Sequence, residues 1–170
     1  IADTWLNDNI DEKVAILYFY PGMQNDILDS VIDNDYHGVV MIGTGLGHVS
    51  SYMFPALERA QDAKIPIFMV VEPLFGNTNL RVYETGRDML ARGVFEGYTM
   101  LPSAAYAKMI WVLGQTRDYS EVRKLMQTNL RGEIVNREPN RGYLFYQGVE
   151  PGLKESLKLL EPNPRKDAYR

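Results

Sequence analysis

A glycine-rich segment is the first place in this sequence where the residue types could support chemistry. It consists of Gly43, Thr44, Gly45, Leu46, Gly47 and His48, and it directly follows the apolar run 38–42 (GVVMI). A loop between a buried strand and a helix can direct backbone N–H groups at an anion. It does not fit the dinucleotide fingerprint G-x-G-x-x-G, because His48 occupies the third glycine position. Two interpretations stay open: a small-anion site, or glycines that only permit a tight turn and close packing.

A hydrolytic site requires a nucleophile beside a base, and the sequence offers no complete set. Thr44, Ser50 and Ser51 are the hydroxyl groups in and just after the glycine-rich segment, and no G-x-S-x-G elbow surrounds them. We therefore predict no catalytic residue in this chain.

Metal sites and carboxylate pairs are also disfavoured. The chain has two histidines, His37 and His48, without metal-ligand spacing, and no cysteine, which excludes disulfides and thiolate zinc sites. We predict that His37 lies in a surface turn and that His48 caps a helix or packs. Asp26, Asp29 and Asp33 recur on one face of a predicted helix, which is typical of a solvated surface. We expect neither a metal nor a cofactor.

Composition bounds the class of protein. A chain of 170 residues with 45% hydrophobic and 24% charged residues predicts one main folded domain. A net charge of −4 argues against a non-specific nucleic-acid binder. No run reaches the roughly 20 apolar residues that span a bilayer, and the absence of cysteine favours a cytoplasmic location. The first residue is Ile1 rather than Met, so we expect that something upstream was removed, either by processing or because the chain is part of a longer one.

Three apolar runs predict strands: residues 14–20 (VAILYFY), 38–42 and 65–71. Each is short, rich in β-branched or aromatic residues and bounded by turn signals, as expected of strands buried on both faces. Helical patterns separate them, so the chain predicts an α/β fold in which helices cover both faces of a parallel, Rossmann-like three-layer sheet. Functional loops are then expected at the carboxyl ends of the strands.

The predicted helices have apolar faces at helical spacing. We expect a first helix at 25–33 and a second helix that begins after Ser50 or Ser51, one of which caps it. Three more helices are expected at 81–92, at 103–113 and at 119–130, the last with Ser120 as its cap. The residues expected to face inward are Ile27, Leu28, Val31 and Ile32 in the first helix, Leu57, Ala60 and Ala63 in the second, Val82, Thr85, Met89 and Leu90 in the third, and Ala104, Met109, Ile110 and Leu113 in the fourth.

The pattern changes near the end of the chain. We predict an α/β domain over residues 1–134 and an appended arm and tail over 135–170, with a β-like run at 143–146 and an amphipathic stretch at 153–160.

Several segments in a fixed order resemble the C-terminal domain of the asparaginase family, and within it the archaeal glutamyl-tRNA(Gln) amidotransferase D subunits. Together they cover about residues 14–134, and their joint occurrence is more specific than any single glycine loop. The segments are 20–22 (YPG), 43–49 (GTGLGHV), 82–87 (VYETGR) with 93–94 (GV), 100–102 (MLP), 105–114 (AYAKMIWVLG) and 129–134 (NLRGEI).

The resemblance implies a two-domain enzyme whose N-terminal domain carries the threonines, aspartate and lysine that attack a side-chain amide. This chain has no matching T-G-G-T segment. It resembles the smaller domain, which packs beside the catalytic one and faces a neighbouring subunit's active site across a dimer interface. The residues expected to form a substrate wall or interface are Tyr20, Pro21, Gly22, Gly43, Thr44, Gly45, Leu46, Gly47 and His48.

For the D subunits, the resemblance implies glutamine hydrolysis whose ammonia passes to a partner E subunit acting on glutamyl-tRNA. It also implies that this chain is a homodimer and is inactive without the N-terminal domain. Secreted bacterial asparaginases carry an asparagine in the loop that matches 43–47, whereas this chain has Leu46. The alternative hypothesis is a stand-alone module that binds a small anion at residues 43–48.

Overall fold

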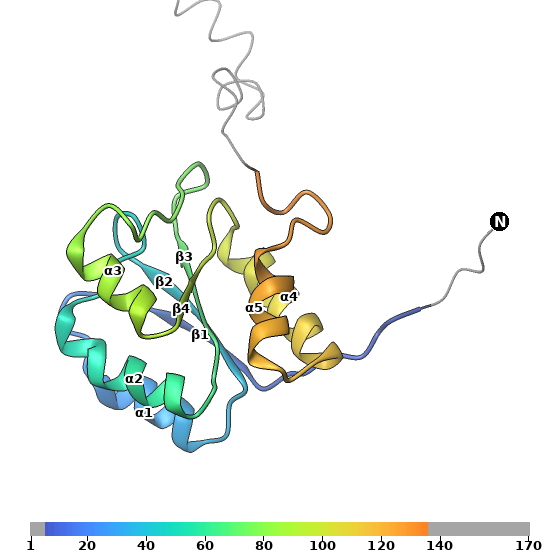
Figure 1. The fold of residues 1–170 in the computed structure, drawn as a ribbon, viewed down its shortest axis with the longest axis horizontal. Helices are drawn as coiled ribbons and strands as arrows, with labels where there is room; N and C mark the ends of the chain where they lie inside the picture. Colours follow the sequence, from blue (N-terminus) through green and yellow to red (C-terminus); the bar gives the residue numbers. More distant parts are fainter. Residues whose placement is uncertain (1–5, 136–170) are drawn as a thin grey trace, which may run out of the picture. The chain divides into compact units, whose positions relative to one another are not determined.

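The computed structural model describes residues 6–135, which form a parallel β-sheet between two layers of helices (Figure 1). The strands lie in the order β1-β2-β3-β4, and each neighbouring pair is parallel. Their bounds are β1 Val14–Tyr18, β2 Gly38–Gly43, β3 Ile67–Val71 and β4 Val94–Glu96. The predicted α/β class with a parallel sheet is confirmed.

The described residues also form five α-helices and one 3-10 helix, of which the last two follow the last strand. Their bounds are α1 Asn25–Asp33, η1 Ser51–Met53, α2 Phe54–Asp62, α3 Glu84–Ala91, α4 Pro102–Gln115 and α5 Tyr119–Gln127. Helices α1, α2 and α3 cover one face of the sheet, and α4 and α5 cover the other. The predicted three-layer arrangement is therefore present.

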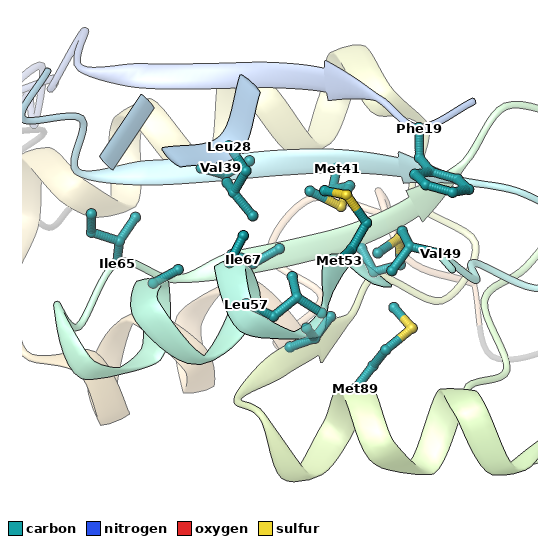
Figure 2. Packing of buried hydrophobic residues seen from close by; sticks show 14 of the residues in the cluster. Phe19, Leu28, Val39, Met41, Val49, Met53, Leu57, Ile65, Ile67 and Met89 are labelled. Carbon is teal, nitrogen blue, oxygen red and sulfur yellow. The ribbon is translucent and has the colours of Figure 1, made fainter. Parts of the chain in front are cut away.

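Alternate residues of each central strand supply the two cores, because successive side chains of a strand point to opposite faces. Val39 and Met41 of β2 belong to the core under α1 to α3, where they meet residues such as Leu57 (Figure 2). Val40 and Ile42 belong to the core under α4 and α5. Every residue of β2 and β3 is buried, as the apolar runs predicted.

The first strand differs from its prediction. We expected residues 14–20 to be buried on both faces, but β1 ends at Tyr18, and Ile16 and Tyr18 are 45% and 47% exposed. The physical reason is position, because β1 pairs only with β2 among the described strands and is an edge of the sheet. Tyr20 then enters a turn in which Gly22 has a φ of +91°.

The third and fourth strands also differ from the prediction. The third strand begins at Ile67 rather than Ile65, since Pro66 has no N–H to donate to a neighbouring strand. The fourth strand was not predicted, because its three residues, Val94 to Glu96, are too short to show an alternating pattern.

The third helix is shorter than predicted. It begins at Glu84, so Val82 and Thr85, which we expected to face inward, are exposed, while Met89 is buried as predicted. Gly86 takes the inward position because its helix packs closely against the preceding loop. A Cβ at Gly86 would lie 2.1 Å from the carbonyl oxygen of Leu80.

The predicted serine caps were wrong. Asp118, not Ser120, caps α5, and its carboxylate accepts hydrogen bonds from the backbone N–H groups of Ser120 and Glu121 at 3.1 and 2.9 Å. Ser50 precedes η1 without a side-chain cap bond. Ala63 lies just past the end of α2 and is exposed. Sequence spacing alone does not determine which of two nearby polar residues takes the extended backbone that a cap requires.

The main domain extends through Val135 in the described residues. Ile134 is buried, and the backbone N–H of Val135 donates to Thr99 Oγ1 at 2.8 Å. The arm predicted for residues 135–170, including the runs at 143–146 and 153–160, otherwise lies outside the described residues.

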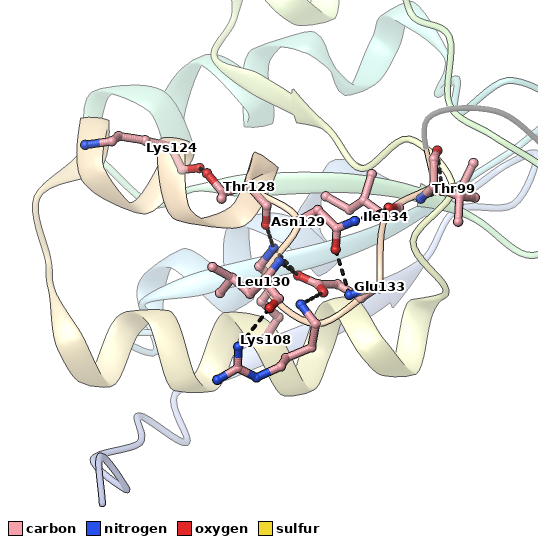
Figure 3. Close-up of polar contacts among 11 residues, drawn as sticks. Thr99, Lys108, Lys124, Thr128, Asn129, Leu130, Glu133 and Ile134 are labelled. Carbon is pink, nitrogen blue, oxygen red and sulfur yellow. Dashed lines mark hydrogen bonds and ion pairs between the residues drawn. The ribbon is translucent and has the colours of Figure 1, made fainter. Parts of the chain in front are cut away.

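An ion pair between buried Lys108 and partly buried Glu133 holds the last described turn against α4 (Figure 3). Lys108 Nζ donates to Glu133 Oε1 at 2.6 Å and also to the carbonyl oxygen of Thr128. The same carboxylate accepts backbone N–H bonds from Leu130 and Arg131 at 3.0 and 2.6 Å. Burial acts to raise the pKa of Glu133, but the Lys108 and backbone hydrogen bonds outweigh it and lower the pKa to about 2.

This pair predicts a defined acid sensitivity. Because the pKa of Glu133 is lower in the folded chain than its ordinary 4.5, its contribution is complete above pH 4.5 and is lost as the pH falls toward 2. At pH 7, Glu133→Gln is expected to lower the free energy of unfolding by roughly 1–3 kcal/mol, because it leaves Lys108 buried without its counter-charge. The difference from the wild type should shrink below pH 4.5, as urea unfolding at pH 7, 4 and 3 will measure.

The matched control is Glu121→Gln, which removes an exposed ion pair with Lys124 at 3.3 Å. Exposed pairs of this kind contribute little, so stability should change by less than about 0.5 kcal/mol. A Glu133 variant as stable as this control at pH 7 would contradict the role assigned to the buried pair.

Candidate functional site

The glycine-rich segment after β2 is a closed turn. Thr44 and His48 form a two-way backbone bridge, in which Thr44 N–H donates to His48 O at 3.0 Å and His48 N–H donates to Thr44 O at 2.8 Å. Gly47 N–H also donates to Thr44 O at 3.0 Å. Three backbone N–H groups are therefore used inside the turn, which gives the anion-cradle interpretation less support than the packing interpretation.

The glycines at the two ends of the turn are required by close backbone approach. A Cβ at Gly43 would lie 2.6 Å from the carbonyl carbon of Gly47. Gly47 has a φ of +93°, and a Cβ there would lie 3.0 Å from Thr78 Cγ2. Gly45 is different: it has a φ of +57°, but a Cβ would meet nothing within 4 Å. Its position at the tip is open to a binding partner.

The segment that follows β3 is hydrogen-bonded to the loops that follow the two neighbouring strands, β2 and β4. Asn79 N–H donates to Leu46 O at 2.9 Å, which joins this segment to the glycine turn. Thr78 exchanges two hydrogen bonds with Tyr98 after β4: its N–H donates to Tyr98 O at 2.9 Å, and its Oγ1 accepts from Tyr98 N–H at 2.7 Å. The loops after β2, β3 and β4 thus form one connected edge of the domain.

Two buried polar residues in this edge were missed by sequence reasoning. Glu96 is 4% exposed, and its carboxylate accepts the backbone N–H of Leu80 at 2.9 Å and lies 3.4 Å from Arg81 Nε. Thr78 is 3% exposed. Neither belongs to a recognisable motif, so only the fold shows that they position the segment 78–81.

His48 packs rather than caps. Its ring meets Tyr83 edge to face, with centroids 5.3 Å apart. Its Nε2 atom is buried and has no hydrogen-bond partner among the described residues. Burial lowers the pKa of His48, so the neutral ring is favoured. A Cβ at Gly86 would lie 2.7 Å from this nitrogen, so His48 also fixes the approach of α3.

The turn after β1 lies at the same end of the sheet, because Tyr18 pairs in register with Ile42. Tyr20 and Pro21 are exposed, and the N–H of Gly22 donates to Tyr52 Oη at 3.1 Å. The hydroxyl of Tyr18 donates to the carboxylate of Glu72 after β3, and this hydrogen bond raises the pKa of Tyr18. The fold therefore brings both predicted wall segments, 20–22 and 43–48, to the carboxyl ends of adjacent strands.

No serine or threonine hydroxyl is paired with a base at this edge in residues 6–135, and the hydroxyl that meets a carboxylate there is that of Tyr18. The hydroxyl of Thr44 donates to the backbone carbonyl of His48 at 3.1 Å rather than to the imidazole ring. The described residues contain no group of three histidines or acids able to hold a metal ion.

Two of the three acids predicted to lie on a helix surface, Asp29 and Asp33, form ion pairs there. Arg59 of α2 binds Asp29 at 2.9 Å and also Asp33, both on α1. His37 lies at the opposite end of the sheet from the glycine turn, at the start of β2, where its Nδ1 is 3.1 Å from the carboxylate of Asp11. None of the helices in the described part is long and apolar enough to cross a bilayer.

Comparison with known proteins shows that this domain is similar to members of one protein family. Residues 13–126 match the family model for the glutaminase/asparaginase C-terminal domain. The glutamyl-tRNA(Gln) amidotransferase D subunit from Pyrococcus furiosus is 45% identical over 134 residues, which are 79% of this chain and 31% of the relative. The D subunit from Aeropyrum pernix is 41% identical over 144 residues, 85% of this chain and 34% of the relative. The chain thus spans about a third of these relatives' length.

Solved structures show the same similarity. The thermostable L-asparaginase from Thermococcus kodakarensis superposes with a TM-score of 0.71 and 30% identity, covering 76% of this chain and 40% of the asparaginase. L-asparaginase I from Vibrio cholerae gives a TM-score of 0.70 and 26% identity over the same shares.

Replacing the two kinds of glycine in the turn should lower the free energy of unfolding by different amounts. Gly43→Ala should lower the free energy of unfolding by roughly 3 kcal/mol, because the new Cβ overlaps backbone that cannot move freely. Gly45→Ala should cost only about 1 kcal/mol, the strain of a left-handed alanine in open space. Urea unfolding of both variants will measure the difference, and equal costs would contradict the packing role of Gly43.

The buried imidazole predicts a second pH effect. Since the pKa of His48 is lower in the folded chain than its ordinary 6.5, the unfolded chain binds more protons, and stability falls as the pH drops below 6.5. His48→Phe should reduce this loss between pH 7 and pH 5, which thermal unfolding at both values will show. An unchanged pH dependence in the variant would mean that the ring titrates freely.

Proposed function

We propose, since this chain belongs to the glutaminase/asparaginase C-terminal domain family, that it is the non-catalytic domain of an amidohydrolase of the amidotransferase type. The observation that carries the proposal is the connected edge at the carboxyl ends of the strands, which has a defined shape but, in residues 6–135, no serine or threonine hydroxyl paired with a base. In this proposal the threonine nucleophiles belong to an N-terminal domain, and this domain supplies one wall of the amide-binding site.

The wall consists of the exposed parts of two turns. Tyr20, Pro21 and Gly22 follow β1, and residues 43–48 follow β2. The N–H of Asn79 donates to Leu46 O and holds the second turn before any partner arrives, while the hydrogen bonds of Thr78 to Tyr98 fix the segment that carries Asn79. Such preorganisation lowers the cost of positioning a substrate. Leu46 would present an apolar side chain there, so substrate contact at this wall would come from backbone groups and neighbouring side chains.

Exposed aromatic side chains on the loops at this edge support an interface role. Tyr20, Tyr52 and Tyr83 are 50%, 42% and 58% exposed. Tyrosine is enriched at protein interfaces because it combines a large contact area with a polar tip. We propose that these residues contact the N-terminal catalytic domain or a second copy in a homodimer.

The reaction that we propose for the whole protein is based on its similarity to glutamyl-tRNA(Gln) amidotransferase D subunits. Glutamine would be hydrolysed to glutamate and ammonia, and a partner E subunit would use the ammonia to convert glutamyl-tRNA(Gln). The net charge of −4 supports a division of labour in which the partner holds the tRNA.

The division of labour predicts an inactive fragment. The purified 170-residue chain, incubated with glutamine or asparagine, should release no more ammonia than a heat-denatured control, because it lacks the T-G-G-T segment that carries a threonine nucleophile. A coupled glutamate dehydrogenase assay measures this directly. Hydrolysis that scales with the concentration of folded chain would contradict the proposal.

A chimera tests the positive half of the proposal. Residues 13–135 would replace the corresponding domain of the Pyrococcus furiosus D subunit, and glutaminase activity should be retained. In that chimera, Tyr20→Ser should lower kcat/KM about tenfold while the melting temperature stays unchanged. The matched control is Tyr36→Ser, at the opposite end of the sheet, which should leave kcat/KM unchanged. Thermal-shift screening with glutamate and phosphate separates the alternative, since a stand-alone anion module would be stabilised without the other domain.

A further inference from the structure

Helix α4 carries apolar residues on both its inner and its outer side. Ala105, Met109 and Val112 face the sheet and are buried. Ala104, Ala107 and Trp111 lie at positions that face a groove on the outer side of the helix. The one charged residue of the helix, Lys108, is paired internally. A helix with apolar residues on opposite sides is typical of one that is covered on both sides.

The outer side of α4 forms the floor of a groove with a volume of about 780 Å³. One wall is Asn7, whose carbonyl oxygen accepts a hydrogen bond from Trp111 Nε1 at 3.1 Å. The other wall is the turn that contains Leu130 and Arg131. This volume falls within the range of about 300–1,000 Å³ found for small-molecule sites. None of the lining residues belongs to the wall segments 20–22 and 43–48.

Two cationic groups lie at the end of the groove formed by this turn. The side chain of Lys108 is 6% exposed, and two of its three N–H donors have acceptors, Glu133 and Thr128, among residues 6–135. The guanidinium of Arg131 donates to its neighbour's carbonyl, Leu130 O, at 3.0 Å, and no carboxylate of the described residues pairs with it. Glu133 neutralises Lys108, so the part of the groove formed by residues 6–135 has one uncompensated positive charge.

We propose that this groove binds a small monocarboxylate with an aromatic or branched aliphatic body. The carboxylate would accept the remaining N–H of Lys108 and pair with Arg131, because a buried ammonium and a guanidinium are strong donors to carboxylate oxygens. The apolar body would lie on Ala107, Trp111 and Leu130. The single net charge matches a monoanion, and the apolar floor favours a ligand with an apolar body over a free inorganic anion.

The test uses 3-phenylpropionate as the probe and its neutral amide, 3-phenylpropionamide, as the matched control. Each is titrated into the ¹⁵N-labelled 170-residue chain and followed by chemical-shift changes. The acid should shift the signals of Ala107, Trp111 and Leu130 and bind about tenfold more tightly than the amide, since it gains the charged hydrogen bonds. The indole N–H of Trp111, which donates to Asn7, should be among the shifted signals.

Two variants locate the site. Arg131→Gln should remove most of the preference for the acid, whereas Arg87→Gln, a change of another arginine that donates to backbone carbonyls, should preserve it. Ala107→Trp fills the groove from an exposed helix position and should abolish binding of both compounds. The proposal is overturned by equal affinities for acid and amide, by a preference that survives Arg131→Gln, by shifts confined to residues 43–48, or by no binding up to the solubility limit.

Discussion

The contact between Gly43 and Gly47 is the constraint on which the candidate site depends. The chain leaves β2, makes a bridge between Thr44 and His48, and returns close enough that neither end can carry a side chain. This reversal places Leu46 O where Asn79 binds it and places Gly47 beside Thr78. The segment after β3 is held in turn by Tyr98 and Glu96 of the next strand and loop. A backbone contact in one turn thus determines the shape of the edge across three strands.

Much of the fold could be predicted because the signals were local and strong. The apolar run at β2, the amphipathic pattern of α1 and the alternation of strands with helices were sufficient for the parallel three-layer arrangement. The family was also recognised from the sequence, because short segments recur in a fixed order across the domain. The match over residues 13–126 confirms that resemblance.

The remainder depended on information that a single sequence does not contain. Burial of β1 depends on whether another strand flanks it, and β4 is too short to carry a period. The cap of α5 was assigned to Ser120 although Asp118 holds it, since both residue types favour caps and only backbone geometry distinguishes them. Glu96 and Thr78 could not be identified as site residues, because their partners come from loops that are adjacent only in the folded chain.

Strand β1 has the apolar sequence of a central strand but lies at the edge of the sheet. Its five residues, VAILY, include no proline and no charge, and no further strand pairs with its outer side in the described residues. Edge strands in natural proteins usually contain lysine, proline or a β-bulge. These features prevent the unpaired backbone N–H and C=O groups from pairing with extended segments of other molecules. Concentrated preparations of this domain should therefore aggregate through strand addition at β1. A lysine in place of Ile16 is the substitution that would keep the preparation dispersed.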